Sequence, residues 1–217
     1  MSSESRAVLW DMDGTLLDSS HYHWLTWREV LAEEGFDLTR EQFAASFGRR
    51  NDDTLRDYFG QGFPLNEVER ISNIKETRYR EMVRTRGVEP MPGVRRLLER
   101  LRTGGWRQAV ASSAMLLNIE AVLEALKINK YFDRIASAED VRRGKPDPEI
   151  FLVAAKKLAA LPARSIVIED SPAGITAARK AGMRSIGVLS SHDSLEADYV
   201  VRSLDELPDD FFDQLQY

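Results

Sequence analysis

Two pairs of acidic residues each follow a short apolar run of the chain. Asp11 and Asp13 follow the first run, and Glu169 and Asp170 follow a later one. If the two runs are neighbouring parallel strands, these four carboxylates meet, and each close pair costs about 4 kcal/mol at about 4 Å with an effective dielectric constant of about 20. Such a cluster needs a cation or shifted protonation states. Oxygen ligands without His or Cys favour a hard octahedral ion, so the residues predict a site for Mg²⁺.

Two further groups suit a phosphoryl ligand. Ser112 and Ser113 end another apolar run, and their hydroxyl and backbone N–H groups can donate to phosphate oxygens. Lys145 lies between Gly144 and Pro146, where it can balance a nearby carboxylate and an incoming phosphate of about −1.5 to −2 charges. Taken alone, Lys145 would be an ordinary surface lysine in a proline turn.

The elements that must position these groups alternate between strands and helices. Short unbroken apolar runs, typical of buried parallel strands, occur at 7–10, 108–111, 165–168, 185–188 and 199–201. Amphipathic helical patterns separate most of them. This alternation predicts an α/β protein with a doubly wound parallel sheet, in which ligands bind beyond the carboxyl ends of the strands.

A long stretch after the first strand contains no strand-like run. We expect residues 19–89 to form an inserted helical bundle, with residues 1–18 and 90–217 forming the α/β core. Pro90, Pro92 and Gly93 mark the return to the core.

Polar residues predict where the helices of this insertion begin. Thr39 with Gln42 is a capping-box pattern for the second helix. Asn51 or Asp52 can cap the third helix, and Asn66, with Glu69 three residues on, is expected to open the fourth.

Composition narrows the class of protein. The 217 residues include 30 Lys and Arg against 35 Asp and Glu, a net charge of −5, which argues against a nucleic-acid partner. The absence of cysteine excludes disulfides, thiolate zinc sites and a cysteine nucleophile. The N-terminal segment, residues 1–6, is polar and unlike the apolar stretch of a signal peptide, and no run of roughly 20 apolar residues occurs. We therefore expect a cytoplasmic protein with no membrane contact and infer no obligate protein partner.

Taken together and in order, these motifs resemble a known family. The segment 11–15, Ser112, Lys145 and the pair 169–170 look like the four signature motifs of the haloacid dehalogenase-like superfamily. The β-phosphoglucomutase-like subgroup, which has a small helical cap, is indicated by further segments: 18–27, 144–148 and 169–174. The resemblance covers nearly the whole chain. It implies a Rossmann-like α/β core with an inserted all-helical cap.

The resemblance implies Mg²⁺-dependent hydrolysis of a small phosphomonoester, such as a sugar phosphate, through a covalent aspartyl phosphate. Asp11 would be the nucleophile that attacks phosphorus. Asp13 would protonate the leaving oxygen and then activate water. Superfamily dehalogenases lack the second aspartate, so Asp13 favours phosphate over halide chemistry.

The remaining motif residues would bind the metal and the phosphoryl group. The implied metal ligands are Asp11, Asp13 (through its backbone carbonyl), Glu169 and Asp170, with Glu169 either binding the ion directly or contacting one of its ligands. Ser112 and Lys145 would hold phosphoryl oxygens and contribute to catalysis.

The cap distinguishes a phosphatase from a mutase. In β-phosphoglucomutases a cap arginine, three residues after a glycine, holds the second phosphate of the substrate. Here the third position after Gly48 is Asn51, and Phe47 replaces the lysine that precedes the glycine. Both departures favour a phosphatase, although Arg49 or Arg50 leaves the mutase alternative open.

Other residues lie near the predicted site outside the four motifs. We expect His23, Arg49, Asn51 and Ser113 to contact the substrate, with a hinge role or simple packing as the alternatives for His23. His192, in a polar loop, is expected to be solvated.

Three alternatives use the same residue types. A phosphonoacetaldehyde hydrolase needs a Schiff-base lysine in the cap loop, whereas the only cap lysine, Lys75, falls in the long fourth helix. Receiver-type signalling modules also combine clustered acids, a hydroxyl and a lysine around Mg²⁺, but they are shorter and have no helical insertion. A catalytically silent binding protein is disfavoured because every motif residue is present.

Overall fold

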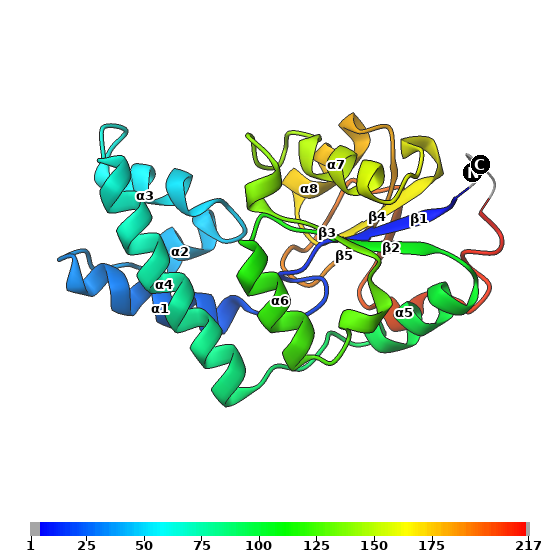
Figure 1. Ribbon diagram of the computed structural model, residues 1–217, viewed down its shortest axis with the longest axis horizontal. Helices are drawn as coiled ribbons and strands as arrows, with labels where there is room; N and C mark the ends of the chain where they lie inside the picture. The colour runs from blue at the N-terminus through cyan, green and yellow to red at the C-terminus, as the bar shows by residue number, and fades with distance from the viewer. Residues whose placement is uncertain (1–4, 216–217) are drawn as a thin grey trace.

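The structure, a computed structural model, describes residues 5–215. Its centre is a six-stranded parallel sheet in the order β3-β2-β1-β4-β5-β6 (Figure 1). The strands are β1 Ala7–Trp10, β2 Arg107–Ala111, β3 Arg134–Ala136, β4 Ser165–Glu169, β5 Arg184–Val188 and β6 Tyr199–Val201. β1 therefore lies between β2 and β4, with Trp10 paired to Val110 on one side and to Ile168 on the other. The predicted α/β doubly wound sheet is confirmed.

Helices cover both faces of this sheet. The core helices are α5 Val94–Thr103, α6 Leu116–Ala125, α7 Glu149–Lys157 and α8 Pro172–Lys180. Successive side chains of a strand point to opposite faces, so Val8 and Trp10 pack into one buried cluster while Ala7 and Leu9 pack into the other. The strands are apolar on both faces because both are buried.

The helical insertion has an apolar core of its own. Its helices are α1 Ser20–Glu33, α2 Arg40–Ser46, α3 Asn51–Phe59 and α4 Leu65–Arg86. Trp24, Trp27 and Leu31 of α1 pack with Leu55 of α3 and Ile71 of α4 in a cluster separate from the two beside the sheet. Figure 1 shows these helices side by side at one end of the molecule.

The chain leaves the core and returns to it at one place. Leu17 forms an isolated bridge with Pro90, and the Met91 N–H donates to the Leu16 carbonyl at 2.9 Å. The two connections between core and insertion therefore run side by side.

The residues expected to cap the helices of the insertion are confirmed for α2 but not for α3 and α4. The Thr39–Gln42 capping box is present. The expected caps of α3 and α4 were wrong, because extended Arg50 precedes α3 and Pro64 precedes α4, neither with a side-chain cap. The strand β3, which has three residues and an exposed first residue, was missed since such a short run has no readable alternation.

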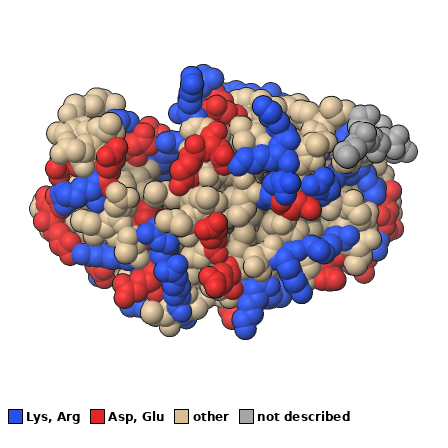
Figure 2. Space-filling model, in the orientation of Figure 1, with Lys and Arg blue, Asp and Glu red and all other residues tan. Residues whose placement is uncertain are grey.

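The surface mixes charges of both signs. Figure 2 shows lysine and arginine side chains interspersed with aspartate and glutamate over the visible face. Within residues 5–215, no helix has the length and apolar character needed to cross a bilayer. Part of the polar N-terminal segment considered above lies outside the described residues.

Candidate active site

The acidic site lies where the two central strands end. Asp11 directly follows β1, Glu169 is the last residue of β4, and Asp170 comes next. Ligand oxygens of these three side chains all lie within 4.8 Å of one another. The sheet order therefore joins two motifs that lie far apart in the sequence. Three of the four carboxylates expected to meet lie together, whereas the side chain of Asp13 is not in this cluster.

Lys145 lies among these carboxylates. Its Nζ donates to Asp11 Oδ1 at 2.5 Å and to Glu169 Oε1 at 2.6 Å. The lysine side chain is only 7% exposed, and the Phe151 ring lies 5.1 Å from Nζ. Burial opposes its charge, but attraction to Asp11 and Glu169 prevails and raises the pKa of Lys145. The ammonium is therefore a fixed positive charge in the site.

One ammonium does not balance three carboxylates. Burial raises the pKa of Asp11 well above its ordinary value. Attraction to Lys145 lowers this pKa, whereas repulsion from Glu169 and Asp170 raises it further. Burial, followed by repulsion from Glu169, raises the pKa of Asp170 to about 7. A further cation in the cluster would offset this repulsion and favour the ionised carboxylates.

Two glycines leave room for these carboxylates. Gly14 has φ +85°, a conformation that favours glycine, and a Cβ there would collide with the Asp170 carboxylate. A Cβ at Gly174 would collide with Glu169, whose Oε2 accepts the Ser171 N–H at 2.6 Å. The carboxylates are thus packed closely against backbone.

The side chain of Asp13 faces the insertion instead of this acidic group. It accepts a short hydrogen bond from Ser19 Oγ, and its Oδ1 lies 3.4 Å from His23 Nε2. Burial alone would raise the pKa of Asp13, but His23 and Ser19 outweigh it and lower the pKa. His23 Nδ1 lies 2.9 Å from Lys75 Nζ, a contact that puts the ring proton on Nε2, toward Asp13.

Ser112 and Ser113 follow β2 at the same edge. Ser112 is buried, its N–H donates to the Ala136 carbonyl, and its Oγ accepts the Ala114 N–H at 3.1 Å. Ser113 lines the adjoining cavity.

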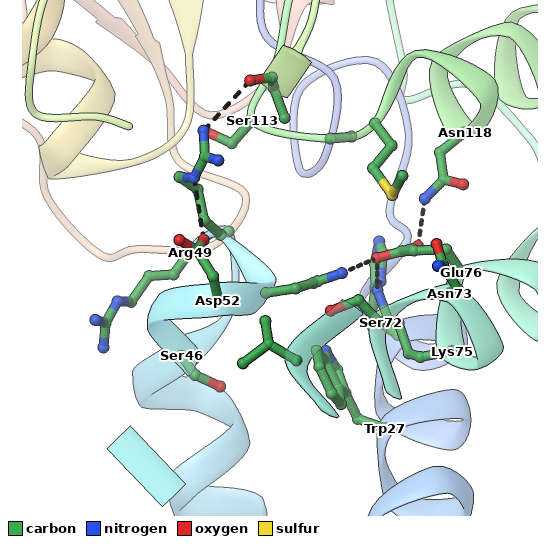
Figure 3. A pocket seen from close by; sticks show the side chains of 18 of the residues that line it. Trp27, Ser46, Arg49, Asp52, Ser72, Asn73, Lys75, Glu76, Ser113 and Asn118 are labelled. Atoms are coloured by element: carbon green, nitrogen blue, oxygen red, sulfur yellow. Dashed lines mark hydrogen bonds and ion pairs between the residues drawn. The ribbon is translucent and has the colours of Figure 1, made fainter. Parts of the chain in front are cut away.

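A cavity of about 350 Å³ extends from Asp13 between the core and the insertion (Figure 3). The residues expected to contact substrate, His23, Arg49, Asn51 and Ser113, all line it. Arg49 is bound by Asp57 at 2.5 Å, and Asn51 Nδ2 donates to Glu76 Oε1 at 2.7 Å. The cavity is thus placed to hold the part of a ligand that lies beyond Asp13.

Lys75, Glu76 and Asn118, all buried and lining this cavity, were not among the predicted site residues. A signal for Lys75 exists, since it lies on the buried face of α4, four residues after Ile71 and four before Tyr79. A charged residue in that apolar register needs a buried partner. His192 is exposed as expected, but its Nδ1 also lies 3.1 Å from the Asp170 carbonyl oxygen.

Known proteins with similar sequences and structures include both mutases and phosphatases. A family model described as haloacid dehalogenase-like hydrolase matches residues 8–188. A β-phosphoglucomutase of Bacillus subtilis is 32% identical over 208 residues, covering 93% of this chain and 91% of that protein. The fructose-1-phosphate phosphatase YqaB of Escherichia coli is 32% identical over 187 residues, covering 83% of this chain and 95% of that protein.

Solved structures agree with these sequences. β-Phosphoglucomutase from Clostridium difficile superposes with a TM-score of 0.87 at 28% identity, over 97% of this chain and 96% of that chain. CbbY from Rhodobacter sphaeroides, in complex with xylulose-(1,5)bisphosphate, gives a TM-score of 0.86 at 26% identity, over 94% and 96%.

Proposed function

This chain belongs to the haloacid dehalogenase-like hydrolases, a family of phosphatases and phosphosugar mutases, and we propose that it hydrolyses a small phosphomonoester through an aspartyl phosphate on Asp11. The observation that carries this proposal is the position of Lys145 between Asp11 and Glu169 at the strand ends. A lysine there can bind a phosphoryl oxygen beside the nucleophile.

The acidic cluster fits a magnesium ion. Asp11, Glu169 and Asp170 supply oxygen atoms only, and they carry more negative charge than Lys145 balances. We propose that these side chains and the Asp13 carbonyl hold Mg²⁺. When bound, the ion would neutralise charge on the phosphoryl oxygens.

In the first step, a carboxylate oxygen of Asp11 attacks phosphorus as the ester P–O bond breaks. The leaving oxygen takes a proton from Asp13, whose low pKa in the unliganded site rises when a negatively charged phosphoryl group arrives beside it. Lys145 and Ser112 hold the phosphoryl oxygens. Splitting one displacement into two steps lowers the barrier of each.

In the second step, Asp13 accepts a proton from water, which attacks the phosphorus of the aspartyl phosphate. The bond to Asp11 breaks, and inorganic phosphate leaves. The hydrogen bonds from Ser19 and His23 favour the ionised form of Asp13 that this step needs.

We also propose that residues 19–89 act as a cap that opens to admit substrate. The side-by-side connections at Leu17 and Pro90 support a single hinge. Closure would exclude bulk water while the alkoxide leaves.

A magnesium-dependent assay tests the proposal. Hydrolysis of p-nitrophenyl phosphate should require Mg²⁺ and stop on addition of EDTA. Interconversion of glucose phosphates without release of inorganic phosphate would favour the mutase alternative. A stable stoichiometric phosphoprotein without turnover would favour a receiver-like module. If neither turnover nor a phosphoprotein is observed, the binding-protein alternative is favoured.

A further inference from the structure

A buried carboxylate, Glu76 of α4, lines the cavity beyond Asp13, and the proposed chemistry makes no use of it. Glu76 is only 4% exposed. Its Oε1 accepts from Lys75 Nζ at 2.7 Å and from Asn51 Nδ2 at 2.7 Å, and its Oε2 accepts a short bond from Asn118 Nδ2. Figure 3 shows Glu76 with Lys75 and Asn118 beside the cavity.

Glu76 is charged in this setting. Burial opposes ionisation, but the charges of Lys75 and His23 and the hydrogen bonds from Lys75 and Asn51 prevail and lower the pKa of Glu76. Three donors from α3, α4 and α6 fix the carboxylate in place. The cavity therefore contains a negative charge that can neither turn away nor be fully screened by solvent.

The cations that line the cavity are each matched to an acid. Arg49 pairs with Asp57 at 2.5 Å and Lys75 with Glu76. Arg50 pairs at 3.1 Å with Asp52, an acid that also contacts Arg56. Within the described residues, the lining holds these three cations against five acids: Asp13, Asp52, Glu69, Glu76 and Glu139. A second anionic group on a ligand would meet no unmatched cation in this lining.

Neutral groups complete the wall. Trp27, Phe47 and Val68 give it an apolar side. Ser72 Oγ is buried and has no hydrogen-bond partner among the described residues. A rotation of its side chain toward the cavity that Ser72 lines would let this hydroxyl bond a hydroxyl group of a ligand. An apolar wall with such a hydroxyl suits an uncharged alcohol that carries both C–H and O–H groups.

We infer that Glu76 makes this cavity an anion-excluding subsite, so that the enzyme selects phosphomonoesters whose alcohol part is uncharged and hydroxylated and rejects those with a second phosphate or carboxylate. The inference rests on the proposed function, since it names the substrate class of that site. It also gives Glu76 a specificity-determining role in place of a merely structural one.

Two aryl esters test this selection. para-(Hydroxymethyl)phenyl phosphate and para-carboxyphenyl phosphate share the same scissile bond and differ in charge at the far end. With Mg²⁺ present, kcat/KM for the hydroxymethyl ester should exceed that for the carboxyl ester by about tenfold or more. Equal values, or a preference for the carboxyl ester, would overturn the inference.

Glu76→Gln keeps the shape of the side chain but removes the charge and leaves Lys75 without its acid. The ratio of the two kcat/KM values should fall to about one or below. Glu81→Gln makes the same charge change on an exposed part of α4 and should keep the wild-type ratio. A Glu76→Gln enzyme that also keeps the wild-type ratio would contradict the role of Glu76.

A binding measurement separates this inference from the proposed function. Dissociation constants of both esters for Asp11→Asn, whose amide cannot attack phosphorus, should show the same preference. If no ester is hydrolysed by the wild type, the proposed function fails while these constants still decide the inference. If Glu76→Gln does not fold, the wild-type and Asp11→Asn ratios decide it.

Discussion

In the core, one ammonium faces three carboxylates, whereas each cation that lines the cap cavity is paired with an acid. Lys145 contacts Asp11 and Glu169, and Asp170 lies close by. The core site thus has unbalanced negative charge, which a metal ion and a phosphoryl group together can satisfy. The lining of the cap cavity has no unmatched cation and more acids than cations, so it disfavours a ligand with a second anionic group. The difference separates the chemistry, which the core performs, from the choice of substrate, which the cap makes.

The largest expected effect tests the core side of this comparison. Asp11→Asn should lower kcat by about 10³-fold or more, because the amide lacks the nucleophilic oxygen. Circular dichroism should show an unchanged fold, since the two side chains are nearly the same size. Appreciable turnover by this variant would remove Asp11 from its assigned role.

Removing the ammonium should have the next largest effect. Lys145→Met leaves the carboxylates without their cation, and kcat should fall by about 10²- to 10³-fold, the effect of losing one charge that stabilises the transition state. Lys156→Met, at an exposed position of α7, is the matched control and should keep its activity. If both variants were equally active, the core site would not depend on Lys145.

The unbalanced charge of the core site should also make the stability of the folded protein depend on pH. The carboxyl of Asp170 titrates near 4 when unfolded and at about 7 when folded, so between these values the folded state binds more protons. The contribution of Asp170 to the stability of the metal-free protein should therefore be complete below about pH 4 and fall as the pH rises toward about 7.

Thermal melting with and without Mg²⁺ measures this effect. The rise in Tm on adding Mg²⁺ should be larger at about pH 8, where the carboxylates are ionised, than at about pH 5. A rise that is the same at both pH values would show that the acidic cluster does not hold the ion.

The smallest expected effect lies at the junction of cap and core. Asn118 of α6 contacts both Glu76 and Arg80 of α4. Asn118→Ala should lower the free energy of unfolding by about 1 to 3 kcal/mol, because it leaves buried polar partners unsatisfied. KM should rise while kcat changes little. A large loss of kcat would mean that this contact also positions Asp13.

The two regions differ in how far the sequence predicts them. Asp11, Ser112 and Glu169 end apolar runs, and a parallel sheet brings strand ends together, so short segments are enough to place them. The hydrogen bond between Glu76 and Asn118 joins residues that are 42 positions apart in the sequence. Its geometry depends on how α4 packs against α6. Periodicity indicates that Lys75 is buried, but it does not indicate which acid accompanies it. The first residues of α3 and α4 were misplaced for a related reason, since backbone geometry at Arg50 and Pro64 prevailed over nearby capping side chains.

Trapping the covalent intermediate tests the central claim most directly. The enzyme, quenched in acid during turnover of p-nitrophenyl phosphate with Mg²⁺, can be digested and analysed by mass spectrometry. The account predicts one phosphoryl group on the peptide that contains Asp11, and none in Asp11→Asn. A phosphoryl group on another residue, or turnover with no phosphorylated peptide when hydrolysis of the intermediate is slowed by Asp13→Ala, would contradict it.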